Sequence, residues 1–242
     1  MTGNNTKLGK IPPLDERILY EDNHLIVVNK WPSEIIQEDK TGDLPLNESV
    51  KQYIKKKYNK PGDVYLGIVH RIDRPVSGAV VFGRTTKAVK RLNELVKTRQ
   101  IRKTYWAVVK NKPAETEGTL TNFLLKNEKK NKSFVYEKEI NYSKEAILSY
   151  RLIAKSKDYN LLEIDLKTGR HHQIRAQLAH IGCPIKGDIK YGFPRTNADA
   201  SIHLHARKIE FIHPVRKKLL EVAANPPDDP LWNYFLDVRP GL

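Results

Sequence analysis

The apolar positions of this chain recur with two periods, one typical of β-strands and the other of amphipathic helices. Alternation and short apolar runs predict two strands joined by a tight turn within 18–29, and further strands over 79–82, 103–109, 147–154, 161–166 and 201–213. Helical spacing predicts helices over about 44–58, 86–98 and 171–181. The strands at 147–154 and 161–166 are expected to pair antiparallel across a short turn.

Local signals refine these elements. Asp43 directly precedes the helix predicted at 44–58, and we expect it to cap that helix. The alternation within 201–213 slips by one residue near Arg207 and Lys208, which predicts a bulge. Residues 111–144 are charged and rich in turn residues, so we predict no second core there and an exposed hairpin or mobile loop at 126–132. The tail after Asn225 is expected to dock through Trp232 and Phe235.

Composition narrows the class of protein. The chain has 242 residues, enough for one sizeable core or two small domains. It carries 43 Lys and Arg against 28 Asp and Glu, a formal charge of +15, which favours a polyanionic partner such as nucleic acid. No apolar run approaches the roughly 18 residues of a membrane span, and the start of the chain lacks a signal-peptide core. We therefore expect a soluble, cytoplasmic protein.

The stretch over residues 66–85, LGIVHRIDRPVSGAVVFGRT, concentrates the candidate chemistry. It places Asp73 near four basic residues, which are His70, Arg71, Arg74 and Arg84. Neighbouring cations favour the ionised form of a carboxylate. The Pro75 and Ser77-Gly78 signals indicate a turn before the apolar run at 79–82, so Asp73 is predicted on a loop that feeds a buried strand. An ion pair that only ties down this turn explains the same residues equally well.

Further candidates lie on the elements that follow. Tyr105, in the strand predicted at 103–109, can stack on a base or pack in the core. Arg175 lies at the edge of the apolar face of the helix predicted at 171–181 and can reach an adjoining cleft. Arg170 and the free amides at the start of that helix offer an anion site suited to phosphate. His203 and His205 share a strand face, but without an acidic or cysteine ligand nearby we predict no metal site.

The segment HRIDRPVSGAVVFGRT resembles the catalytic motif of the RluA-type RNA pseudouridine synthases. Residues 103–108, 167–175 and 182–192 resemble further signatures of that family in the same order. The resemblance implies an α+β fold, a single catalytic domain with a central mixed, mainly antiparallel β-sheet flanked by helices and loops. It also implies conversion of a specific uridine in rRNA or tRNA to pseudouridine.

The resemblance further implies roles for individual residues. Asp73 would be the essential carboxylate, which either attacks the nucleotide or abstracts a proton, and Arg175 would hold it as a two-point clamp. Tyr105 would stack on the target base and Arg71 would fill the space that the flipped uridine leaves. The isomerisation has no redox step, so no cofactor or metal is expected.

The sequence also leads to expectations for domain organisation and partners, and in the absence of a signal for oligomerisation a monomer is the default. We expect a loosely ordered lead-in over 1–16 and a catalytic domain over 17–242, with no separate N-terminal RNA-binding domain. The expected partner is the RNA substrate, with no membrane and no obligatory protein partner, and we expect a monomer.

Three other functions fit the sequence less well. A basic RNA-binding protein that retains the synthase scaffold without activity would not need the acid Asp73. A kinase is disfavoured because the Asp does not directly follow the Arg of the His70-Arg71 pair and no glycine-rich loop precedes it. A metal nuclease would need clustered acids that this sequence lacks.

Overall fold

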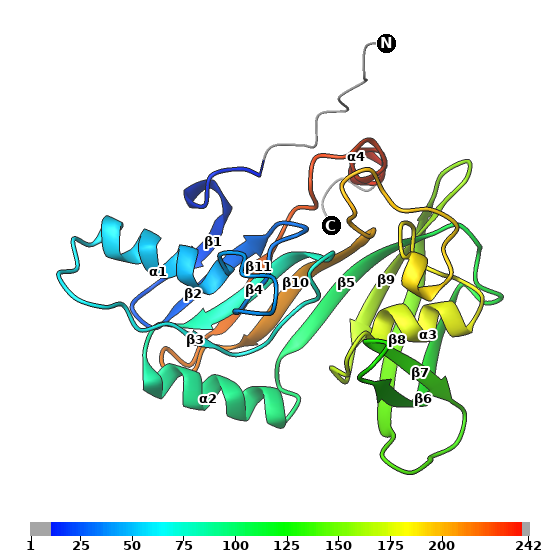
Figure 1. Ribbon diagram of the computed structural model, residues 1–242, viewed down its shortest axis with the longest axis horizontal. Helices are drawn as coiled ribbons and strands as arrows, with labels where there is room; N and C mark the ends of the chain where they lie inside the picture. The colour runs from blue at the N-terminus through cyan, green and yellow to red at the C-terminus, as the bar shows by residue number, and fades with distance from the viewer. Residues whose placement is uncertain (1–10, 239–242) are drawn as a thin grey trace.

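The computed structural model describes residues 11–238, which form one large mixed β-sheet with helices on both faces (Figure 1). The strands are β1 (Ile18–Glu21), β2 (Leu25–Lys30), β3 (Gly67–Ile68), β4 (Ser77–Gly83), β5 (Arg102–Val109), β6 (Glu117–Asn127), β7 (Lys132–Tyr136), β8 (Lys144–Lys155), β9 (Asn160–Leu166), β10 (Leu204–Ile212) and β11 (Leu219–Ala223). The helices are α1 (Leu46–Lys57), α2 (Thr86–Lys97), α3 (Gln173–His180) and α4 (Pro230–Asp237), with short 3-10 turns η1 (Asp15–Arg17) and η2 (Ile189–Tyr191).

The strand order is β1-β2-β4-β10-β5-β9-β8-β6-β7, with β3 paired to β4 and β11 paired to β10. Only the pair β4 and β10 is parallel among the pairings of the described strands. At this junction Gly78 has φ of 121° and lies opposite Ala206, and a side chain at position 78 would collide with the Ala206 backbone. The α+β prediction of a mainly antiparallel central sheet is confirmed.

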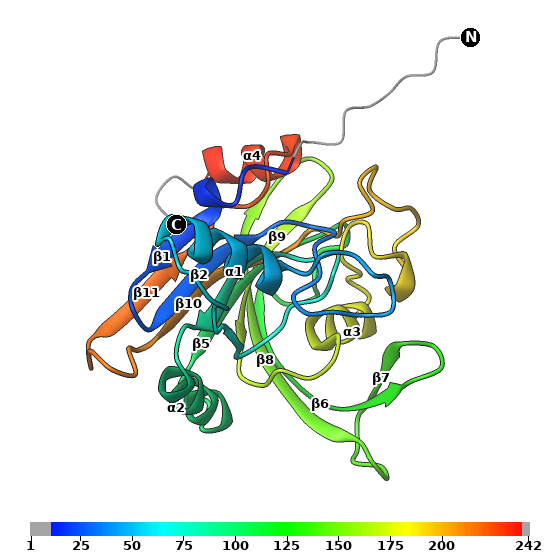
Figure 2. The same ribbon diagram turned by 60° about the vertical axis from the view of Figure 1, so that its left-hand side comes forward.

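Helices cover both faces because successive strand residues point to opposite sides. In β2, Leu25 and Val27 pack with α2, while Ile26 and Val28 pack with α1. In β5, the residues Tyr105, Ala107 and Val109 lie in the cluster that contains Ile174 and Leu178 of α3. Trp106 and Val108 point the other way, toward Trp232 and Phe235 of α4, so the predicted docking of the tail is confirmed. Figure 2 shows the β6–β7 hairpin at the end of the sheet, next to α3.

Some local predictions are confirmed and others are wrong. The register of β10 against β5 shifts between Ala206 and Lys208, as the slip in alternation predicts. Asp43 does not cap α1, because Pro45 occupies the N-cap position and the Asp43 carboxylate pairs with Arg74. Ser77 and Gly78 are not a turn but the first, buried residues of β4.

The region over 111–144 contains regular structure that the sequence did not indicate. β6 spans eleven residues there and pairs with both β7 and β8. Leu124 of β6 lies in a small buried cluster with Ala146, Ala176 and Tyr191, so a minor core exists where none was predicted. The hairpin predicted at 126–132 is confirmed as the β6–β7 connection.

The sequence also predicts a loosely ordered lead-in at the start of the chain. Of the predicted lead-in over 1–16, residues 1–10 lie outside the described residues. In the remainder, Pro12 accepts a hydrogen bond from Arg17, whose buried guanidinium pairs with Glu34. The boundary between lead-in and catalytic domain stays a prediction. Among residues 11–238, no helix is long and apolar enough to cross a membrane.

Candidate active site

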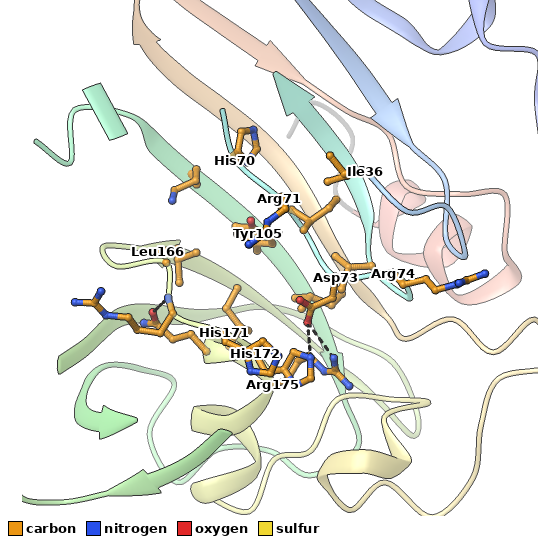
Figure 3. Close-up of a pocket in the computed structure, with 18 of the residues that line it drawn as sticks. Ile36, His70, Arg71, Asp73, Arg74, Tyr105, Leu166, His171, His172 and Arg175 are labelled. Atoms are coloured by element: carbon orange, nitrogen blue, oxygen red, sulfur yellow. Dashed lines mark hydrogen bonds and ion pairs between the residues drawn. The ribbon is translucent and has the colours of Figure 1, made fainter. Parts of the chain in front are cut away.

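The loop over residues 69–76, ahead of β4, carries Asp73 at one wall of a cleft of about 1130 Å³ (Figure 3). A turn closed by the Val76 amide and the Asp73 carbonyl, 3.0 Å apart, fixes the backbone of this loop. The Asp73 side chain keeps 28% of its surface exposed. The prediction that Asp73 lies on a loop feeding a buried strand is confirmed.

The buried side chain of Lys30, at the end of β2, hydrogen-bonds to the backbone of this loop. Lys30 Nζ donates to the carbonyl oxygens of Trp31, Arg74 and Val76, at 2.9, 3.0 and 2.7 Å. Burial lowers the pKa of Lys30 to about 7, although the charges of Glu34 and Asp73 oppose that shift. Sequence reasoning missed this role, whose signal is the Asn29-Lys30 pair after the buried strand.

Arg175 of α3 approaches Asp73 from the opposite wall. Its Nη1 donates to Asp73 Oδ2 at 2.9 Å, while Nε and Nη2 donate to the two oxygens of Asp188 at 2.7 and 2.9 Å. The two-point clamp on Asp73 was therefore the wrong geometry, because the fork of Arg175 is directed at Asp188 and a single nitrogen remains for Asp73. Asp188 is 1% exposed and lies in the Gly187-Asp188 segment matched from sequence, but its role was not predicted.

This triplet of charges holds one side of Asp73 and leaves the other free. Burial alone would lower the pKa of Arg175, but the hydrogen bonds and charges of Asp188 and Asp73 raise it, so the guanidinium is a permanent cation. No described residue donates a hydrogen bond to Asp73 Oδ1. The carboxylate is thus oriented through Oδ2, and Oδ1 is available to a bound molecule.

His172, at the start of α3, adds a neutral ring beside Asp73. Burial first, and then the charge of Arg175, lower the pKa of His172 to about 2. The Tyr191 hydroxyl accepts a hydrogen bond from the Ser133 amide at 2.8 Å and lies 3.1 Å from His172 Nδ1. The other ring nitrogen of His172, Nε2, lies 3.6 Å from Asp73 Oδ2. Sequence reasoning had placed this residue only as the beginning of a helix.

Three of the basic residues predicted around Asp73 do not contact it. His70 is buried with Nε2 accepting from the Val81 amide, and burial lowers its pKa to about 3, so it is neutral. Arg84 pairs with Glu21 at 2.9 Å. Arg74 points away from Asp73, as Figure 3 shows, and pairs with Asp43. Proximity in sequence was misleading because each of these side chains is held by another partner.

Tyr105 and Arg71 line the same cleft as Asp73. The Tyr105 ring is 7% exposed, and burial, reinforced by the charge of Asp73, raises the pKa of its hydroxyl, which stays protonated. Arg71 is exposed and makes no hydrogen bond or ion pair with another described residue. A flat aromatic surface, an oriented carboxylate and an unpaired guanidinium thus line one space, which can accommodate a nucleoside.

Arg170 also lines the cleft, and its Nε donates to the Glu145 carbonyl at 2.9 Å. The amide of Gln173 donates to the Arg170 carbonyl, and the amide of Arg170 donates to Gln173 Oε1. The amides of Arg170 and Gln173 therefore have partners, and the anion site predicted at this helix start stays a prediction. Cations do surround the opening, and those lining the cleft include Lys97, Arg99, Lys103, Lys126, Lys167, Arg170 and Lys190.

His203 and His205, in the predicted strand at 201–213, make structural contacts. His205 Nδ1 lies 2.8 Å from Ser77 Oγ and its Nε2 lies 3.0 Å from the Ala224 carbonyl. His203 stacks on Trp232 and its Nε2 lies 3.1 Å from Asp229 Oδ1. Across residues 11–238, no group of three or more His, Cys, Asp or Glu side chains is arranged to hold a metal ion.

Comparison with known proteins provides independent evidence. The family model described as RNA pseudouridylate synthase matches residues 24–180. The chain is 34% identical over 230 residues to the ribosomal large subunit pseudouridine synthase D of Xylella fastidiosa, covering 90% of this chain and 67% of that protein. It is 33% identical over 228 residues to the synthase C of Buchnera aphidicola subsp. Baizongia pistaciae, covering 91% of this chain and 69% of that protein.

The fold is also similar to a solved structure. Human RNA Pseudouridylate Synthase Domain Containing 4 superposes with a TM-score of 0.77 at 22% identity, covering 93% of each chain.

Proposed function

This chain belongs to the RNA pseudouridylate synthase family, isomerases that convert uridine to pseudouridine in RNA, and from this premise we propose that Asp73 is its catalytic carboxylate and rRNA its substrate. The observation that carries the proposal is the position of Asp73 in the lining of the cleft, where its Oδ2 is held by buried Arg175 and its Oδ1 accepts no hydrogen bond from a described residue.

The reaction requires a carboxylate that is fixed in orientation and keeps one oxygen free of other partners. The bond from N1 to C1′ of the uridine breaks, the uracil turns, and C5 bonds to C1′, after which C5 releases a proton and N1 takes one up. Asp73 either attacks the nucleotide or abstracts a proton, and both roles need an ionised carboxylate with an accessible oxygen. Anchoring through Oδ2 supplies orientation, and the free Oδ1 supplies the reacting atom.

Three other residues that line the cleft with Asp73 bind the substrate. The Tyr105 ring, buried at the base of the cleft, offers the surface on which the uracil stacks while it is detached. Arg71 is exposed at the same cleft and occupies the space that the flipped uridine leaves in the RNA. Arg170, with Nε fixed on the Glu145 carbonyl, keeps its terminal nitrogens for the RNA strand.

One observation favours rRNA over tRNA as the substrate. Both relatives described above are named for the ribosomal large subunit. The formal charge of +15 and the cations that line the cleft suit any structured RNA and do not distinguish the two.

Mapping of pseudouridine in rRNA and tRNA tests both parts of this proposal. Cells that lack the gene should lose pseudouridine at one or a few rRNA positions, and a wild-type copy should restore it. A copy with Asp73→Asn should not restore it, whereas Arg74→Gln, which changes the adjacent exposed residue, should. Loss confined to tRNA would contradict the rRNA assignment, and restoration by Asp73→Asn would contradict the role of Asp73. A non-catalytic RNA-binding protein would leave both RNAs unchanged.

A further inference from the structure

Lys103 lies beside Tyr105 in the cleft but has no assigned task. The two residues are two apart in β5, so their side chains leave the same face of the strand, and both line the cleft with Asp73. Lys103 Nζ lies 3.5 Å from the point where a side chain on Gly169 would begin, which places the ammonium against the loop that precedes α3.

The ammonium of Lys103 is partly buried without a counterion. It makes no hydrogen bond or ion pair with any residue between 11 and 238. Burial lowers its pKa below the ordinary value for lysine. Its neighbour Arg102 points to the opposite side, where it is exposed and lies 3.7 Å from Asp165. An ammonium that loses water without gaining a partner costs free energy, so an oxygen anion entering the cleft would be favoured beside it.

The surroundings of Lys103 select for an anion. Lys97, Arg99, Lys167 and Arg170 line the same cleft, so positive charge predominates around Lys103. The Cα atoms of Lys103 and Tyr105 are about 7 Å apart along the strand. This spacing is similar to the distance that the sugar of a nucleotide bridges between its base and its phosphate. A compact ammonium also suits phosphate better than a neutral carbonyl oxygen.

We propose that Lys103 Nζ binds a phosphate oxygen of the nucleotide whose base stacks on Tyr105, and so fixes the target uridine along β5. This inference rests on the proposed function, since it takes the target base to lie on Tyr105. It assigns Lys103 to substrate binding and leaves bond breaking to Asp73.

Binding of uridine, uridine 5′-monophosphate and uridine 3′-monophosphate to the purified protein tests this site, using calorimetry or NMR titration. For wild type, one of the two nucleotides should bind about tenfold more tightly than uridine, as expected for one charge-assisted hydrogen bond. The nucleotide that gains shows which phosphate Lys103 contacts. Lys103→Gln should abolish the gain and leave uridine affinity unchanged, and Lys103→Arg should retain part of it.

The matched control is Arg102→Gln, which removes a cation from the opposite face of the same strand and should keep the full gain. Three results would overturn the proposal: no gain for either nucleotide in wild type, an equal gain in Lys103→Gln, or a parallel loss of uridine affinity in Lys103→Gln, which would indicate a structural role. Because no turnover is measured, these outcomes are independent of whether Asp73 is the catalytic group.

Discussion

The buried wall of the cleft and its exposed edge use the same chemical groups in opposite settings. At the wall, Arg175 is 5% exposed and joins Asp73 to Asp188, which is 1% exposed. At the edge, Arg74 pairs with Asp43, and the two side chains are 41% and 51% exposed. Arg74 is adjacent to Asp73 in sequence, yet it is Arg175, 102 residues away, that contacts the carboxylate. The difference teaches that desolvation and not sequence proximity decides which cation governs Asp73.

Replacing the buried arginine should have the largest effect. Arg175→Lys leaves one ammonium where three guanidinium nitrogens served two carboxylates, so Asp73 loses its orientation. We expect kcat to fall at least about a hundredfold, as for misplaced catalytic groups generally. Loss of the forked buried pair should lower the free energy of unfolding by about 3–5 kcal/mol. Single-turnover kinetics and urea denaturation measure the two effects, and a nearly normal kcat in a folded protein would contradict the orienting role.

Replacing the second carboxylate should have a smaller effect. Asp188→Asn keeps the shape of the side chain but removes the charge that balances Arg175, so the guanidinium is drawn more strongly to Asp73. We expect kcat to fall about tenfold, corresponding to about 1.4 kcal/mol in the barrier, with little change in KM. A change confined to KM would indicate that Asp188 acts on RNA binding instead.

Buried histidines should make stability depend on pH, again in contrast to exposed ones. Burial lowers the pKa of His70 and His205 to about 3, and that of His172 to about 2. Below the ordinary histidine pKa of about 6.5, these rings bind protons in the unfolded chain but stay neutral in the folded chain. The free energy of unfolding therefore decreases as the pH falls from about 6.5 toward 3. Each ring contributes up to about 1.4 kcal/mol per pH unit in that window.

Urea denaturation at several pH values below 7 measures this dependence. His70→Asn should reduce the slope by the share of one ring. Equal slopes for His70→Asn and wild type would show that His70 is not held neutral by the fold.

The smallest effect is expected at the exposed edge. Arg74→Gln removes a cation next to Asp73 in sequence but breaks only a solvated pair with Asp43. We expect kcat to change by less than about twofold, because exposed ion pairs contribute little. A loss comparable to that of Arg175→Lys would remove the distinction between the wall and the edge.

Most of the fold could be predicted because its elements follow clear periods. The β6 strand could not, because its inward positions include Asn122 between Leu120 and Leu124. This polar residue accepts a hydrogen bond from Gln177 of α3 and donates one to Glu137. A partner 55 positions away in sequence leaves no local signal.

The same limit applied to the site. Motif segments located Asp73, Tyr105 and Arg175, but which atoms meet depends on how α3 packs against the loop before β4. The fork of Arg175 on Asp188 and the support of the loop by Lys30 are contacts between distant segments. Local charge density instead pointed to His70, Arg74 and Arg84, each of which has another partner.

Release of tritium from rRNA labelled at uridine C5 tests the central claim most directly, because C5 loses its hydrogen only when the new bond to C1′ has formed. Purified wild type should release tritium, and Asp73→Asn should release none above the enzyme-free background while binding the same RNA with unchanged affinity. Release by Asp73→Asn at a rate near that of wild type would contradict the assignment of Asp73 as the catalytic carboxylate.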